Sequence, residues 1–79
     1  MTIREAVLQQ VRLVAQQQKK MLAVLDDNLG LAESGLDSLC LAIIVANLDD
    51  ELGLDPFDSG IEMPTTLRQF IELYEHAAA

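Results

Sequence analysis

The 79-residue sequence is poor in the residues that usually carry metal, redox or nucleophilic chemistry. It has one cysteine, Cys40, one histidine, His76, and no tryptophan. A single cysteine cannot form an intramolecular disulfide, and a lone histidine adds too little to make a zinc site. No apolar run approaches the roughly 20 residues that a membrane-spanning helix needs. We therefore expect no metal site, no internal disulfide and no membrane span.

Basic residues are also few: five Lys and Arg stand against thirteen Asp and Glu, for a formal charge of −8. No cation occurs between Met21 and Leu67. Phosphate backbones and anionic lipid surfaces would repel such a chain, which disfavours nucleic acid and membrane surfaces as partners. The acidic middle is either a solvated surface or a docking surface for basic proteins. Because the first residues also lack the layout of a secretion signal, we expect one monomeric, cytoplasmic domain over residues 1–79.

Helical periodicity dominates the chain, and we predict an all-α fold, a small four-helix bundle. Thr2 with Glu5, and Thr66 with Gln69, form capping-box patterns at two helix starts. The predicted helices cover residues 2–20, 38–52 and 66–77, with a single helical turn near residues 58–62. A long loop over residues 21–37 separates the first two helices. The expected core residues are Val7, Val11, Val14, Leu41, Val45, Leu48, Phe70 and Ile71.

The predicted helix over residues 38–52 is apolar on two sides. One side would face the core and consists of Leu41, Ile44, Val45, Leu48 and Leu52. The other side carries Leu39, Ile43 and Ala46, spaced i, i+4 and i+7, and is continued by Asp50. Such a helix either lies at the centre of a bundle or presents its second side to a partner.

The side chains that could act as catalysts do not form a catalytic pattern. His76 lies near a helix C-terminus, where the helix dipole stabilises a protonated imidazole. Asp37 adjoins Ser38, so it cannot orient a remote histidine behind that serine as in a Ser-His-Asp triad. The segment from Asp26 departs from a calcium-binding loop, because its glycine comes one place early and an aspartate takes the twelfth place. Cys40 has no base or cation close in sequence. We expect no catalytic residue, and a protein that is not an enzyme.

One segment near the middle of the chain carries a specific motif. It reads Ser34-Gly35-Leu36-Asp37-Ser38-Leu39. A long loop precedes it, an apolar helix follows it, and Pro-Thr-Thr introduces the last helix. This segment closely resembles the attachment motif of acyl and peptidyl carrier proteins. Together with the acidic charge and the order of the helices, the resemblance extends over residues 3–74. The resemblance implies that Ser38 accepts a 4′-phosphopantetheine arm from coenzyme A through a phosphopantetheinyl transferase.

The resemblance also implies where partner enzymes dock. In the family, the aspartate before the modified serine and the residues after it help the transferase to dock. This assigns Asp37 and Leu39 to the cofactor site, and Leu39, Ile43, Ala46 and Asp50 to the partner surface. Carriers of fatty-acid synthesis usually place acids near the start of this helix, whereas its acids here are confined to its end, at Asp49, Asp50 and Glu51. Acids at a helix C-terminus oppose the dipole, which indicates a use other than helix stability. We therefore expect docking to be more apolar here, as in peptidyl carriers.

The motif leaves the cargo open, because Asp-Ser-Leu differs from the His-Ser-Leu common in peptidyl carriers of large synthetases. We predict a free-standing carrier that holds an amino acid or a short acyl group as a thioester. A loading ligase or synthetase would charge it, and a downstream acceptor enzyme would receive the cargo. The alternatives are an acyl carrier of fatty-acid or polyketide synthesis and an unmodified acidic helical adaptor. Because so small a core has little stability to spare, we expect no sizeable apolar pocket between the helices.

Overall fold

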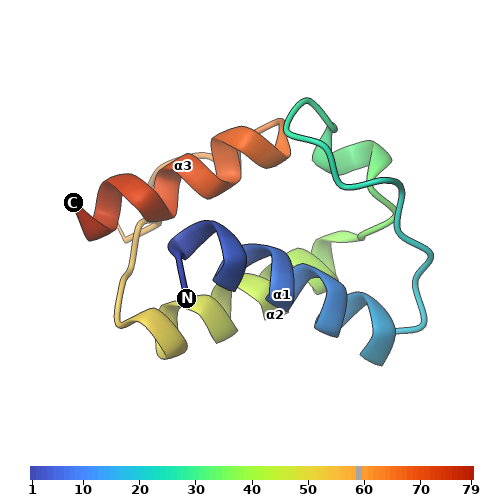
Figure 1. Ribbon diagram of the computed structural model, residues 1–79, viewed down its shortest axis with the longest axis horizontal. Helices are drawn as coiled ribbons and strands as arrows, with labels where there is room; N and C mark the ends of the chain where they lie inside the picture. The colour runs from blue at the N-terminus through green and yellow to red at the C-terminus, as the bar shows by residue number, and fades with distance from the viewer. Residues whose placement is uncertain (59) are drawn as a thin grey trace.

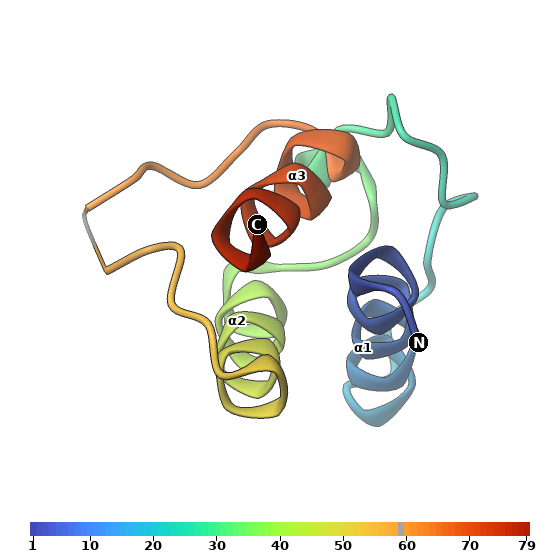
Figure 2. The ribbon, with the colours of Figure 1, turned by 60° about the vertical axis from the view of Figure 1, so that its left-hand side comes forward.

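A computed structural model describes residues 1–58 and 60–79 as a small all-helical domain. Its α-helices are α1 (Ile3–Gln17), α2 (Ser38–Leu52) and α3 (Leu67–Ala78), and a short 3-10 turn, η1, spans Leu31–Glu33. The described residues form no strand. α1 and α2 lie side by side and run in opposite directions, and α3 packs over them (Figure 1, Figure 2). The prediction of an all-helical fold with three main helices is confirmed. No helix in the described part combines the length and the apolar character needed to cross a bilayer.

Side-chain caps explain where α1 and α3 begin. Thr2 accepts a hydrogen bond from the backbone N–H of Glu5, and the Glu5 carboxylate accepts one from the backbone N–H of Thr2. Thr66 and Gln69 make the same reciprocal pair at the start of α3. Each box satisfies two of the donors that a helix start leaves free. Both capping boxes predicted from the sequence are confirmed.

The sequence predicted the C-terminal end of α2 correctly but placed that of α1 too late. α1 ends at Gln17, three residues before the predicted Lys20. The backbone leaves the helix because Lys19 has a left-handed φ of 56°, which a right-handed helix does not include. α2 ends as predicted, with Gly53 as a left-handed C-cap at φ 66°.

The helical turn predicted near residues 58–62 is wrong for the residues of that segment that the structure describes. Residues 56–58 form a turn, Ser59 lies outside the described residues, and residues 60–64 have no regular structure. Gly60 has a φ of 78°, outside the range of a right-handed helical turn. The short helical element is instead η1, which lies inside the predicted loop.

Buried side chains of the three helices and of the loop over residues 21–37 form an apolar core. On the predicted inner side of α2, Ile44 and Leu48 are buried as expected, whereas Leu41 and Val45 are only half-buried at the edge of the core. Cys40 completes the α2 stripe that faces inward. The other predicted core residues are buried, namely Val7, Val11, Val14, Leu48, Phe70 and Ile71. The axis of the α2 stripe is therefore rotated slightly from the one that the sequence predicted.

The loop over residues 21–37 is fixed to the start of α3 by backbone hydrogen bonds. The Leu31 N–H donates to the Thr65 carbonyl (2.8 Å), and the Leu67 N–H donates to the Leu29 carbonyl (2.9 Å). These bonds flank a short antiparallel bridge. Backbone pairing of this kind gives a long loop one defined path instead of many.

Charge fixes the same loop to α1 as well. The Asp27 carboxylate forms ion pairs with Arg4 of α1 and with the Arg68 Nε of α3, the latter at 3.7 Å. The Arg68 backbone N–H also donates to the Asp27 carbonyl (3.0 Å). The hydrogen bond from Arg4 is the main reason why the pKa of the Asp27 carboxyl lies below its usual range. Asp27 thus joins both helices to the loop that leads to α2.

Candidate functional site

The candidate site begins at Ser38, the first residue of α2. The residue that caps this helix is Asp37, whose Oδ1 accepts a hydrogen bond from the Cys40 backbone N–H at 2.8 Å. Asp37 has the extended backbone of an N-cap residue. Ser38 is exposed, and its hydroxyl is not needed for the cap. Asp and Ser are both residue types that commonly cap helix starts, and the structure assigns the cap to Asp37.

A lysine adjoins this helix start, and the sequence analysis did not predict it there. The Lys20 Nζ lies 3.0 Å from the Asp37 Oδ2, so the carboxylate holds the helix cap with one oxygen and the lysine with the other. The hydrogen bond from the Cys40 backbone, followed by the one from Lys20, lowers the pKa of the Asp37 carboxyl far below its usual range. The same pair raises the pKa of Lys20. The site therefore contains a balanced ion pair next to an exposed hydroxyl.

The first residues of the motif are structural. Ser34 is buried, and its hydroxyl donates to the Leu31 carbonyl (2.6 Å) and accepts from the Leu36 N–H (3.2 Å). Its carbonyl accepts from the Ala23 N–H (2.9 Å), which ties the beginning of the loop to its end. A serine whose hydroxyl is buried and doubly bonded is poorly accessible to a modifying enzyme. Ser38, four residues later, is the accessible serine of the motif.

Gly35 is required by its surroundings. Its φ is 98°, and a Cβ placed on it would lie 2.1 Å from the backbone oxygen of Met21. A side chain there would overlap a backbone atom, which cannot rotate away as the tip of a side chain can. Gly35 thus allows the two ends of the loop to pass close to each other, three residues before Ser38.

The predicted partner surface of α2 is largely open. Leu39 is 60% exposed, and Ala46 and Asp50 are exposed as well. Ile43 is half-buried and packs partly against the core. The second apolar side of the helix is therefore not enclosed by the bundle in the described residues, although Ile43 contributes to both surfaces.

Two of the three acids at the end of α2 have partners within the fold. Asp49 accepts a hydrogen bond from the Tyr74 hydroxyl of α3 (2.8 Å), and Glu51 accepts one from the Gln10 amide of α1 (3.1 Å). Burial, and then the bond to Asp49, raise the pKa of Tyr74 well above its usual range. Asp49 and Glu51, which oppose the dipole of α2, thus stabilise contacts between α2 and the other two helices. Asp50 is exposed and was the acid assigned to docking.

The remaining candidates lie away from Ser38. Cys40 is fully buried in the core, as expected of a small apolar helix residue, and His76 lies in the last turn of α3. The hollows on the described surface include one beside the outer side of α3 (about 280 Å³) and one on the loop around Val24 (about 400 Å³). Neither is lined by Ser38 or by any residue of α2.

Comparisons of the chain with protein-family models, with curated proteins and with solved structures gave no match. The motif and the geometry around Ser38 are therefore the features that bear on function.

The double role of Asp37 leads to a stability prediction. Asp37→Ala removes the cap and the Lys20 pair and should lower Tm by about 4–8 °C at pH 7. Asp37→Asn, which keeps a capping oxygen but loses the charge, should lower Tm less.

Because folding depresses the pKa of Asp37, its charge stabilises the fold above its unfolded pKa, and this stability is lost as the pH falls. The Tm difference between wild type and Asp37→Ala should thus shrink from about pH 5 to pH 2 in thermal melts followed by circular dichroism. A difference that stays constant over this range would contradict the role of the Asp37 charge.

Proposed function

We propose that this chain is a free-standing carrier protein, which holds an amino acid or a short acyl group as a thioester on a 4′-phosphopantetheine arm attached to Ser38. In this proposal α1, α2, α3 and the short turn η1 form a bundle of the acyl-carrier type. The observation that carries the proposal is the position of Ser38. Ser38 is exposed, lies at the first position of α2 and belongs to a carrier-like motif. Its hydroxyl is available for modification because Asp37, not Ser38, caps the helix.

The residues around Ser38 fit a phosphodiester linkage. The linkage would add an anion at the N-terminus of a 15-residue helix, where free N–H groups and the helix dipole favour negative charge. Lys20 neutralises the neighbouring Asp37, so that the added anion does not face an uncompensated carboxylate. When bound, the arm supplies the thiol that carries the cargo. The residues of the chain itself expose the hydroxyl, favour the anion through the start of α2 and dock enzymes.

Three kinds of enzyme would act on such a carrier. A phosphopantetheinyl transferase attaches the arm, a ligase or synthetase loads the cargo, and an acceptor enzyme removes it. We assign their docking to Leu39, Ile43, Ala46 and Asp50 on the open side of α2. The carrier acts as a cytoplasmic monomer in this proposal, because it presents its cargo to each enzyme in turn.

The filled interior favours a small cargo. Cys40, Ile44 and Leu48 are fully buried on the inner side of α2, and the two surface hollows are lined by other elements. Sheltering a long acyl chain would require these side chains to move apart, and emptying one large core site costs about 2–5 kcal/mol. An amino acid or a short acyl group gains little from such shelter and can stay in solvent at the end of the arm. Carriers of longer chains in fatty-acid or polyketide synthesis are the main alternative.

The test is the intact mass of the purified chain after incubation with coenzyme A and a broad-specificity phosphopantetheinyl transferase. A carrier gains the mass of one arm, whereas an unmodified acidic adaptor gains none. The loaded protein is then purified with its ligase, and the thioester is identified by mass spectrometry. An amino acid or a short acyl group on the arm supports the proposal, and a long acyl chain would favour the fatty-acid alternative.

Apolar contact should dominate the docking of the loading enzyme. Leu39→Glu places a charge on an exposed apolar position and should weaken loading by about tenfold, because the carboxylate would lose its water when an enzyme covers it. Asp50→Asn, on the same side of the helix, should change loading by less than about threefold and act mainly on the association rate. Leu39→Glu tests docking better than Ile43→Glu does, because Ile43 is half-buried and a charge there would also disturb the core. Loading that collapses in moderate salt but tolerates Leu39→Glu would show that the acids dominate.

A further inference from the structure

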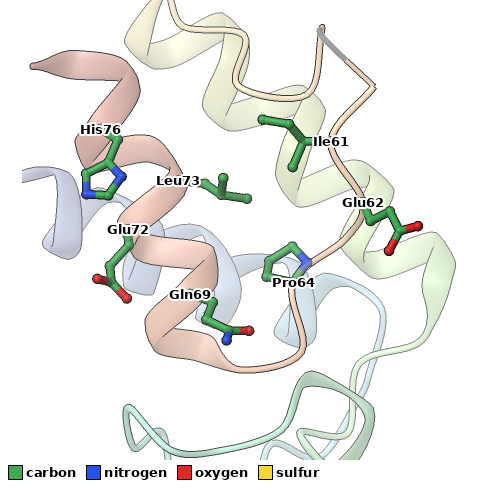
Figure 3. Close-up of a pocket in the computed structure, with 7 residues that line it drawn as sticks. All are labelled: Ile61, Glu62, Pro64, Gln69, Glu72, Leu73 and His76. Atoms are coloured by element: carbon green, nitrogen blue, oxygen red, sulfur yellow. The ribbon is translucent and has the colours of Figure 1, made fainter.

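A groove on the side of α3 remote from α1 has no role in the proposed carrier function. It lies between α3 and residues 61–64, and in Figure 3 the side chains of Ile61 and Leu73 point into the space between these two segments. Pro64 completes its apolar floor. Ile61 is 46% exposed, so a partner could reach its side chain. The rim carries Glu62, Gln69, Glu72 and His76.

The size of the groove limits what it can hold. Its volume is about 280 Å³, and it is largely open to solvent. Pockets for small molecules usually measure about 300–1,000 Å³ and enclose most of the ligand surface. An open groove below this range is suited to one or two side chains presented by a larger partner. The apolar floor indicates that at least one of them is a large aliphatic side chain.

The charge around the groove selects the partner further. Among the described residues that line it, the two charged ones are both glutamates, Glu62 and Glu72. They belong to a chain with a formal charge of −8, in which residues 22–66 contain no Lys or Arg. A partner segment in which an apolar residue is flanked by Lys or Arg would match both parts of the groove. Its apolar side chain would contact the floor, and its cations would lie near the glutamates of the rim. A second copy of this chain would bring the same excess of negative charge, which opposes self-association.

We propose that this groove is a docking site for a basic segment of a partner protein, with one large aliphatic side chain on Ile61 and Leu73 and flanking cations on Glu62 and Glu72. The site is separate from the Ser38 site and does not depend on the arm. The unmodified chain is therefore sufficient to test it, and a Ser38→Ala protein should bind equally well. Failure of the carrier proposal would leave this one standing, and the reverse also holds.

The experiment uses a fluorescein-labelled peptide with a central leucine between two pairs of lysines. Fluorescence anisotropy at low salt should show saturable binding, and the peptide in which serine replaces the leucine should bind about tenfold more weakly. In ¹⁵N-resolved NMR titrations, the shifted amides should cluster at Ile61, Gln69, Leu73 and His76. Ile61→Ser should weaken binding about fivefold, and Glu72→Gln about threefold.

The matched control is Glu75→Gln, which removes the same charge from an exposed position of α3 that does not line the groove. It should leave the affinity within about 1.5-fold, because a single exposed charge away from the contact contributes little. If Glu72→Gln and Glu75→Gln lowered the affinity for the peptide equally, the binding would be general charge attraction, and the proposal would be overturned. Amide shifts confined to α2, no saturation, or a dimer in size-exclusion chromatography that Ile61→Ser dissolves would overturn it as well.

Discussion

Ser38→Ala should abolish the mass gain from coenzyme A and transferase completely while leaving Tm within about 2 °C of the wild type. The loss is complete because alanine has no oxygen to form the phosphodiester bond. Stability is kept because Asp37 forms the cap bond to Cys40, so that the helix start does not depend on the Ser38 hydroxyl. Intact-mass spectrometry and thermal melts on the same samples measure both effects.

Two other serines serve as internal controls for this assignment. Ser34 is buried and bonded through its hydroxyl, so it should stay unmodified in the Ser38→Ala protein. Ser59 lies outside the described residues, and Ser59→Ala should keep the full mass gain. Modification that persists in Ser38→Ala would move the attachment site to another residue and remove the main support for the carrier proposal. A large loss of Tm in that variant would instead contradict the assignment of the cap to Asp37.

The sequence predicted the helices well where the determining contacts are local. The capping boxes at Thr2 and Thr66 depend on residues three apart, and Gly53 ends α2 through its own backbone freedom. The exposed position of Ser38 likewise follows from its place at a helix start. For contacts within one turn of helix, residue type and spacing are sufficient.

The errors concern residues whose partners are distant in sequence. Lys20 leaves α1 and pairs with Asp37, seventeen residues later, and no local pattern indicates this. Asp49 bonds to Tyr74 on another helix, so an acid that opposes the dipole of α2 still has a structural role. Only the packing of three helices brings such groups together, and periodicity along one helix does not contain that information.

The inward axis of α2 was mispredicted for a related reason. Leu41 and Val45 are as apolar as the residues that are buried, so the helical wheel has apolar residues on most of its circumference. A helix of this kind gives a weak signal for direction, and the neighbouring helices decide which stripe is buried. Ile44 and Leu48 are buried as predicted, but Cys40 takes the place expected of Leu41 and Val45 in the buried stripe, and Leu39 stays exposed.

Gly35→Ala should be strongly destabilising, costing at least about 3 kcal/mol of unfolding free energy. The φ of 98° is unfavourable for alanine, and the new Cβ would lie 2.1 Å from the Met21 oxygen, so the backbone of the loop must shift. A chain of 79 residues has roughly 4–12 kcal/mol of stability in total. The variant should therefore show a large drop in the urea midpoint at an unchanged slope.

Gly53→Ala is the matched control, because Gly53 also has a positive φ (66°) but a Cβ there would meet no atom within 4 Å. It should lose only the backbone cost of a left-handed alanine, about 1–2 kcal/mol. The difference between the two variants measures the overlap with Met21. If the fold tolerates Gly35→Ala, the shifted loop should still slow the attachment of the arm, since Gly35 lies three residues before Ser38, whereas Gly53→Ala should not. Equal stability losses for the two variants would show that the close passage of Gly35 and Met21 is not needed to hold the loop in place.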